Sequence, residues 1–301
     1  MSAAKIVRLA DRGVVSVTGR DSEKLLQGLV TNDIEGLRDG EARHAALLSP
    51  QDKILFDFFI LRRGDGYLLD VLRASAGDLA KRLSMYKLRA DVIISDVSDS
   101  FKIYAAWGGE TAGFPVDRAM HFPDPRHSSL GVRLIVEGSP SRDSFADADS
   151  EIALRQYDAL RVLLGVPEGG RDYKFGDAYP HEADFDLFNG VSFSKGCYVG
   201  QEIVARMQNK TVVRQRAVKI SGSAPLSSND DVLVGDVSIG RIGTVDGTAA
   251  IAMLRLDRAL EAKQKSQPLA AGDAAVSVDD IVLESYAASA AARSSTSLPS
   301  P

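Results

Sequence analysis

Cysteine and histidine are both scarce in this sequence of 301 residues. It contains one cysteine, Cys197, and four histidines. A single cysteine excludes an intramolecular disulfide framework and a metal site built from several thiolates. His121 and His127 stand six positions apart in a glycine- and proline-rich stretch, a spacing that is not typical of a metal site. The sequence therefore predicts no metal centre made by this chain alone.

Long apolar runs are missing as well. No stretch approaches the roughly 20 apolar residues that cross a membrane, and residues 1–8 lack the apolar core of a signal peptide. Together with the low cysteine content, this pattern predicts a cytoplasmic protein without membrane contacts. There is also no G-x-G-x-x-G or Walker sequence, so a nucleotide-binding fold is not expected.

The net charge of −5 gives no broad basic surface for nucleic acid. A local basic patch that could contact nucleic acid remains possible around Arg206, Lys210, Arg214 and Arg216. Nucleic acid is therefore not expected as a partner, with tRNA kept as the one exception considered below.

Hydrophobic residues make up 45% of the chain, which is enough for a sizeable core. In the first half the patterns predict strand, helix, hairpin, strand, helix and strand, an α+β arrangement with antiparallel sheets. From Thr211 onward, short strands recur between turn residues, which indicates a small antiparallel barrel. We therefore expect an α+β region of two intertwined subdomains over 1–210, a barrel over 211–286 and a disordered Ala/Ser/Pro-rich tail over 287–301.

Cys197 belongs to the segment Lys195-Gly196-Cys197-Tyr198-Val199-Gly200-Gln201-Glu202. The residues that follow, up to Arg206, can enter a helix, so a loop is expected to bring the thiol to a helix N-terminus, where free N–H groups carry partial positive charge. With Lys195 close by, this environment favours the thiolate. The two flanking glycines allow a positive φ or a close approach to another group. The alternative is a buried, inert cysteine, since free cysteines are among the most buried residues.

Polar residues at two other places have two interpretations each. Thr31-Asn32-Asp33 follow the apolar stripe of a predicted helix, either as a helix stop or as the lining of a ligand cleft. Asp57 stands inside an apolar strand, either on its solvated face or as a polar anchor in a pocket, because burying an unpaired carboxylate is costly.

Tyr157 and Arg161 lie one turn apart on a helix predicted over 151–165. A ring beside a guanidinium can stack a flat heterocycle and hold an acid; the alternative is a tyrosine at the core edge and a solvated arginine. Glu182 and Asp184 can hydrogen-bond the polar edge of a heterocycle or belong to a solvated loop.

The string K-G-C-Y-x-G-Q-E resembles the signature of the folate-binding YgfZ family, relatives of the glycine-cleavage T protein, an aminomethyltransferase. The resemblance extends to about residue 286. It implies an aminomethyltransferase-like folate-binding fold with a C-terminal antiparallel β-barrel, and tetrahydrofolate or a derivative as cofactor. It also implies a folate cavity beside residues 27–33 and beside the helix that ends in G-x-P. The residues implied to bind the cofactor are Asn32, Asp57, Tyr157, Arg161 and Glu182.

The resemblance further implies a role in the assembly or repair of iron–sulfur clusters, carried by Cys197. The other residues implied are Lys195 and Asp57, with a catalytic role, and the motif positions Gly196, Tyr198, Gly200, Gln201, Glu202 and Arg206. A single thiol cannot hold a cluster alone, since clusters need about four ligands. The expected role is thus a transient ligand or relay in a complex with iron–sulfur assembly proteins or client enzymes.

Two alternatives remain open. One is a tetrahydrofolate-dependent one-carbon (aminomethyl) transferase in which Asp57 is central, and the other is a folate-dependent factor that modifies tRNA. The T protein lacks the Lys-Gly-Cys-Tyr core, and this difference favours the cluster role, so a non-enzymatic assembly factor is preferred over an enzyme.

Overall fold

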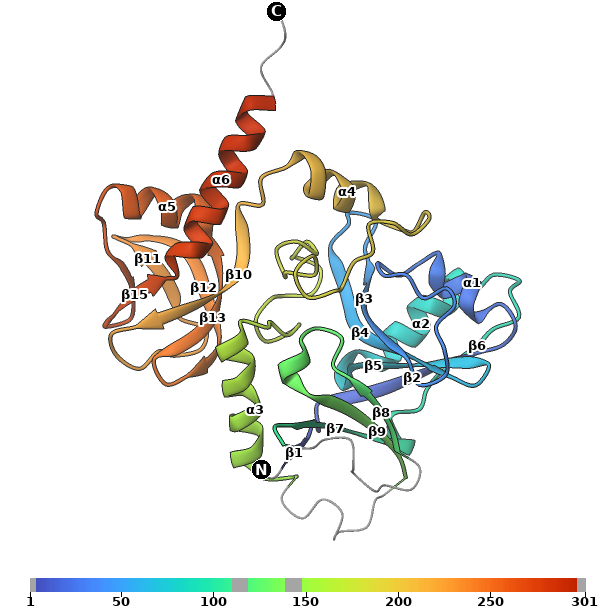
Figure 1. Ribbon diagram of the computed structural model, residues 1–301. Coiled ribbons are helices and arrows are strands. Elements are labelled where there is room, and N and C mark those ends of the chain that lie inside the picture. Colours follow the sequence, from blue (N-terminus) through green and yellow to red (C-terminus); the bar gives the residue numbers. More distant parts are fainter. Residues whose placement is uncertain (1–3, 110–118, 139–147, 297–301) are drawn as a thin grey trace, which may run out of the picture. The chain divides into compact units, whose positions relative to one another are not determined.

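The computed structural model describes residues 4–109, 119–138 and 148–296 (Figure 1). The chain forms two compact units, each built from two segments. The first comprises Met1–Tyr157 and Phe185–Gln201, and the second Asp158–Asp184 and Glu202–Pro301. The units do not follow the expected boundary at residue 210, because the segment 158–184 belongs with the barrel.

A five-stranded antiparallel sheet in the order β3-β4-β5-β2-β6 forms the larger layer of the first unit. One face packs against two helices, α1 (Ser22–Gln27) and α2 (Ala76–Tyr86), through a core that includes Val15, Leu26, Ile60 and Leu79. Side chains alternate between the faces of a strand, so this apolar face follows from the sequence pattern. The strands are β2 (Arg12–Thr18), β3 (Ala42–Leu48), β4 (Ile54–Arg63), β5 (Gly66–Leu72) and β6 (Ile93–Asp96).

A second, four-stranded sheet of the same unit has the order β1-β7-β9-β8. It meets the other face of the larger sheet, where Phe122 of β8 lies edge-on to Phe59 of β4 at 6.1 Å between ring centroids. β8 falls in the glycine- and proline-rich stretch that holds His121 and His127, where the sequence gives no sign of a strand. The strands are β1 (Lys5–Arg8), β7 (Phe101–Trp107), β8 (Ala119–Pro123) and β9 (Val132–Glu137).

The second unit contains a closed six-stranded antiparallel barrel, which confirms the predicted barrel and the α+β class. Its order is β10-β13-β12-β11-β14-β15, closed by pairing of β10 with β15. Inward-facing Ile220, Val232, Ile242 and Leu254 fill its core. The strands are β10 (Gln215–Gly222), β11 (Asp231–Val234), β12 (Val237–Asp246), β13 (Ala249–Arg255), β14 (Leu269–Ala271) and β15 (Ala274–Val278).

Helices α5 (Leu256–Gln264) and α6 (Asp280–Thr296) also belong to the second unit. Residues 287–296 lie in α6, so the expectation of a disordered tail is wrong for them, because alanine has the highest helix propensity. Residues 297–301 fall outside the described part of the chain. No helix among the described residues is long and apolar enough to span a membrane.

Two helices cross the boundary between the units in sequence. α3 (Glu151–Leu164) has Tyr157 in the first unit and Asp158 in the second, and α4 (Gln201–Lys210) starts with the last residue of the first unit. Several of the predicted site residues stand on these two helices, namely Tyr157 and Arg161 on α3 and Gln201, Glu202 and Arg206 on α4.

Candidate functional site

The segment 189–200, here the Cys197 loop, is fastened to the chain that leaves α1. Four hydrogen bonds join the two segments, at both ends of the loop, in addition to those of Lys195. They run from Asn32 Nδ2 to Asn189 O (2.6 Å), from Thr31 Oγ1 to Gly190 O (2.6 Å), from the amide of Ser192 to Thr31 O (3.0 Å) and from the amide of Val199 to Gly28 O (3.2 Å).

Lys195 fixes the middle of this loop. Its Nζ donates to the backbone carbonyls of Gln27 (2.8 Å), Val30 (2.9 Å) and Asn32 (2.7 Å), and lies 5.1 Å from the centre of the Tyr198 ring. An ammonium has three N–H donors, and all three are used here. Burial lowers the pKa of Lys195 to about 8. The structure thus gives Lys195 an anchoring role, and its expected effect on the thiol stays a prediction.

Cys197 is exposed, so the alternative of a buried cysteine is wrong. It precedes the first residue of α4, Gln201, by four positions. The loop does deliver the chain to a helix, as predicted. At that junction the side-chain oxygen of Gln201 accepts a hydrogen bond from the amide of Tyr198 at 3.0 Å.

The two glycines that flank Cys197 in the motif, Gly196 and Gly200, differ in their surroundings. Gly200 has a φ of +87°, and a Cβ there would lie 2.8 Å from Leu48 and 2.9 Å from the Asp52 carboxylate, which confirms the predicted close approach. Gly196 has no positive φ, and a Cβ added there would meet nothing within 4 Å. The geometry therefore requires glycine at 200 but not at 196.

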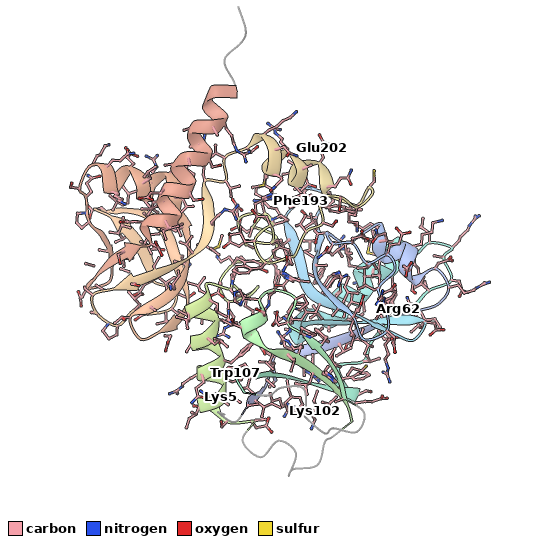
Figure 2. All side chains as sticks on the ribbon, in the orientation of Figure 1. Lys5, Arg62, Lys102, Trp107, Phe193 and Glu202 are labelled. Atoms are coloured by element: carbon pink, nitrogen blue, oxygen red, sulfur yellow. The ribbon has the colours of Figure 1, made fainter. Side chains whose placement is uncertain are left out.

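A cleft of about 900 Å³ lies along one side of the Cys197 loop. Cys197 is not among its lining residues. Phe193, which is 49% exposed and labelled in Figure 2, contributes an aromatic wall. The other lining residues come from the loop itself, from the start of β3 and the residues before it, from the exit of α1, and from β8 with the residues after it: Asn32, Gly40, Glu41, Ala42, Arg43, Phe122, Pro123, Pro125, Asn189, Val191, Ser192 and Ser194.

Of the five residues expected to bind a cofactor, Asn32 lines this cleft. Its amide nitrogen donates to His44 O (2.8 Å) and Asn189 O (2.6 Å), while its side-chain oxygen accepts from the amide of Asp33. Because both amide hydrogens are already used, the side chain of Asn32 holds the cleft walls together. The sequence left two interpretations open for residues 31–33, a helix stop and the lining of a ligand cleft. Asn32 combines a structural role with a place in the cleft lining.

Asp57 lies in the same unit, on β4 opposite Ala46 and on the face that also carries Phe59. It is 8% exposed, so its carboxylate does not sit on a solvated strand face. It is one of the groups that act on buried His44: burial, followed by the charge of Arg126, lowers the pKa of His44 to about 4, while Asp57 opposes this change. Asp57 does not line the cleft, and its predicted ligand contact stays a prediction.

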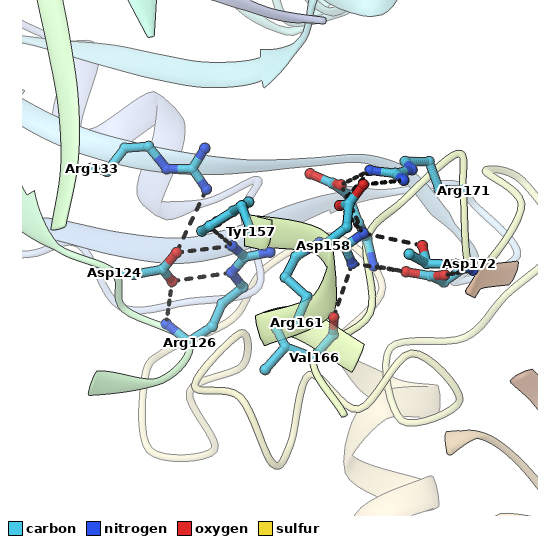
Figure 3. Close-up of polar contacts among 11 residues, drawn as sticks. Asp124, Arg126, Arg133, Tyr157, Asp158, Arg161, Val166, Arg171 and Asp172 are labelled. Carbon is cyan, nitrogen blue, oxygen red and sulfur yellow. Dashed lines mark hydrogen bonds and ion pairs between the residues drawn. The ribbon is translucent and has the colours of Figure 1, made fainter. Parts of the chain in front are cut away.

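Tyr157 is buried and joins a cluster of charged side chains in the first unit (Figure 3). Its hydroxyl accepts from Arg126 at 3.3 Å, and its ring lies 5.3 Å from that of Trp107. Arg126 also forms a two-pronged pair with Asp124, at 3.0 and 2.8 Å. Burial raises the pKa of Asp124, but Arg126 and Arg133 outweigh it and lower this pKa to about 2.

The guanidinium groups of Arg126 and Arg133 both stand over the ring of Phe59, at 5.0 and 4.8 Å from its centre. Arg133 also lies 3.7 Å from Asp70, which accepts a 2.7 Å hydrogen bond from Arg12. This charged layer was not foreseen, because its members come from five separate strands or loops. An aspartate inside the apolar run of β5 is the one signal in the sequence that points to it.

Arg161 has no exposed surface and belongs to the second unit. One terminal nitrogen donates to Asp172 (3.0 Å) and Val166 O (3.1 Å), and the other to Asp158 (3.0 Å) and Thr244 of the barrel (3.1 Å) (Figure 3). The alternative of a solvated arginine is wrong. Its terminal nitrogens are engaged by protein groups, which makes Arg161 a tie between α3 and β12, whereas its contact with a ligand stays a prediction.

The remaining predicted residues also lie in the second unit. Glu182 accepts a hydrogen bond from the amide of Tyr179 at 2.8 Å, which closes a turn, and its carbonyl accepts from the amide of Ala217. Glu202 and Arg206 are exposed on α4. Nothing in these contacts links them to a ligand, so their roles stay predictions.

Residues 214–281 match the family described as CAF17, C-terminal beta-barrel domain. Among solved structures, the glycine cleavage system aminomethyltransferase T from Bartonella henselae superimposes with a TM-score of 0.73, covering 94% of this chain and 86% of that one at 14% identity. The two chains therefore share a fold, and the predicted aminomethyltransferase-like fold is confirmed.

In sequence, the chain is similar to proteins named iron-sulfur cluster assembly factor IBA57 homolog, mitochondrial. The protein from Mycosarcoma maydis is 36% identical over 248 residues, covering 77% of this chain and 61% of that protein. The protein from Dictyostelium discoideum is 29% identical over 252 residues, covering 70% and 61%. The chain thus spans about three fifths of the length of these relatives.

These relatives correct one expectation and refine another. All are named as mitochondrial, which overturns the prediction of a cytoplasmic protein. They are named as IBA57 proteins, so the finer assignment to the YgfZ family stays a prediction. The chain has the aminomethyltransferase fold with a CAF17-type C-terminal barrel, and over about three quarters of its length it is similar to iron–sulfur cluster assembly factors of the IBA57 kind.

Proposed function

We propose that this chain takes part in the assembly of iron–sulfur clusters and that Cys197 supplies one thiolate ligand to a cluster in transit. The observation that carries the proposal is the exposed position of the chain's only thiol, on a loop that is fastened on both sides of it. The similarity to named assembly factors gives the class of cargo. On binding iron, the thiol releases its proton to solvent and the sulfur donates an electron pair to the metal.

The cluster would be shared with a partner protein. Among the described residues there is no group of three or more His, Cys, Asp or Glu that could hold a metal ion. Since a cluster needs about four ligands, the others come from an assembly protein or a client enzyme. An exposed thiol on an anchored loop suits such a transfer, because sulfur must reach the partner while the loop keeps its shape.

We also propose that the cleft beside the loop takes a reduced folate. Its volume of about 900 Å³ lies within the range of small-molecule sites. Phe193, which is 49% exposed, offers a face for a flat ring, and exposed Arg43 offers a cation for the carboxylates of the tail. The residues present therefore fit a folate. The bound folate would supply a flat heterocycle that fills the cleft, while the protein groups orient it.

The test uses cells that lack this protein and carry a plasmid with the wild type, Cys197→Ala or Asp57→Asn. The readout is the activity of an iron–sulfur enzyme, with the amount of each variant measured in parallel. The proposal expects restoration by the wild type and by Asp57→Asn, and none by Cys197→Ala at equal protein level. Full restoration by Cys197→Ala would overturn it.

The second candidate is a tetrahydrofolate-dependent aminomethyl transferase. The shared fold and the buried Asp57 favour it. In that case purified protein would transfer a one-carbon unit to or from tetrahydrofolate, and Asp57→Asn would abolish the transfer. The same substitution therefore separates the two functions, since only the transferase depends on Asp57.

A further inference from the structure

The cleft and the thiol use different parts of one loop. Residues 189 and 191–194 line the cleft, whereas the residues after Lys195 carry Cys197 and do not line it. We call residues 189–194 the cleft arm and residues 196–199 the thiol arm. Lys195 is the single residue between them.

Each arm has its own backbone hydrogen bond to the segment that leaves α1. The amide of Ser192, in the cleft arm, donates to Thr31 O at 3.0 Å, and the amide of Val199, in the thiol arm, donates to Gly28 O at 3.2 Å. Either bond alone is worth little in net terms. Without a further connection, each arm could open without the other.

Lys195 supplies that connection. Its three hydrogen bonds end on carbonyls spread from Gln27 to Asn32, a span that includes the backbone acceptors of both arms. The carbonyl of Asn32 accepts from Lys195 while its side chain lines the cleft and donates to Asn189 O. A ligand that contacts Asn32 therefore contacts a residue whose carbonyl accepts a hydrogen bond from Lys195.

We propose that Lys195 is a positioning residue that makes the two arms open and close as one unit, so that a ligand in the cleft steadies the loop that presents Cys197. This inference rests on the proposed function only in its choice of ligand. The three hydrogen bonds of Lys195 are the physical link, and the two arms become independent when that link is removed.

The experiment is amide hydrogen exchange at Ser192 and Val199, in the full chain, with and without tetrahydrofolate. In the wild type the two amides should exchange with the same protection factor, because one opening exposes both, and tetrahydrofolate should slow both. In Lys195→Met the two protection factors should differ by about tenfold, the effect of a hydrogen-bonded anchor worth about 1.4 kcal/mol, and tetrahydrofolate should slow Ser192 alone.

Lys24→Met is the matched control, because Lys24 is exposed on α1 and its loss removes the same charge. It should behave as the wild type. If Lys195→Met also lowers protection in β3 and β4, the comparison is repeated with Lys195→Gln, which keeps one donor group. Equal protection of both arms in the variant that keeps its sheet protection overturns the proposal.

The measurement without ligand keeps the two proposals apart. If tetrahydrofolate protects neither amide in the wild type, the folate proposal fails. The coupling through Lys195 is then still judged by whether the two amides separate in the variant without ligand.

Discussion

Arg161 and Lys195 each hold a loop in place through hydrogen bonds, but they differ in burial and in the groups that accept those bonds. Both tie a loop to a helix or strand, and both were expected to act on a ligand or a thiol. Arg161 is fully buried against the carboxylates of Asp158 and Asp172. Lys195 is half-buried and its three bonds go to carbonyls, which are dipoles without a full negative charge. We therefore expect the contacts of Arg161 in the barrel unit to be hard to break, and those of Lys195 at the Cys197 loop to open more easily.

The largest expected effect comes from removing Arg161. Arg161→Met removes the charged partner of buried Asp172, while Asp158 keeps its pair with Arg171, and should lower the free energy of unfolding by about 3–5 kcal/mol. Lys195→Met leaves carbonyls that solvent can reach and should cost about 1–2 kcal/mol. Urea denaturation of both variants measures the two values. An equal or larger loss for Lys195→Met would break the distinction between the two ties.

A smaller effect is expected from glycines within the loop. Gly190→Ala places a methyl group into the ring of Phe185 and should cost about 1–3 kcal/mol through overpacking. Gly196→Ala meets nothing within 4 Å and should change stability by less than about 0.5 kcal/mol. Thermal denaturation of the pair gives the comparison. A large loss for Gly196→Ala would show that the tip of the loop is as constrained as its base.

The smallest expected effect is a pH dependence of the free energy of unfolding, which Lys195 can cause and Arg161 cannot. Burial lowers the pKa of Lys195 to about 8 from the ordinary 10.5. Between these values the unfolded chain holds the proton and the native protein does not, so the contribution of Lys195 to the free energy of unfolding rises with pH. Arginine stays charged over this range.

The measurement is the difference in unfolding free energy between the wild type and Lys195→Met at several pH values from about 7 to about 10, the range that brackets the lowered pKa. The free energy of unfolding of the wild type should increase relative to that of Lys195→Met as the pH rises through about 8. A shift in the opposite direction would mean that the three carbonyls hold the ammonium more strongly than burial opposes it.

The sequence predicted the elements whose patterns are local. The alternation in β2, β4 and β5, the stripe of α2 and the short strands of the barrel all follow from side-chain periodicity. The close approach at Gly200 was expected because glycines stand on both sides of Cys197 within the motif. β8 was missed because a glycine- and proline-rich stretch hides a strand that tertiary pairing stabilises, and α6 because its Ala/Ser composition is shared by disordered tails.

The candidate site could be predicted only in part. Cys197 and Asn32 stand where a motif and a helix exit indicate them. The partners of Tyr157 and Arg161 could not be foreseen, because Arg126 and Thr244 are distant in sequence and reach their places only through folding. The spacing of Tyr157 and Arg161 on a helix predicts neighbouring positions, but their side chains contact two separate groups of residues.

The most direct test of this account is titration of the native protein with a thiol reagent. The chain has one cysteine, so the result needs no other substitution to interpret. The account predicts that one thiol per chain reacts at once under native conditions, since Cys197 is exposed. A thiol that reacts only after denaturation would contradict the exposed position of Cys197, on which the proposed ligand role rests.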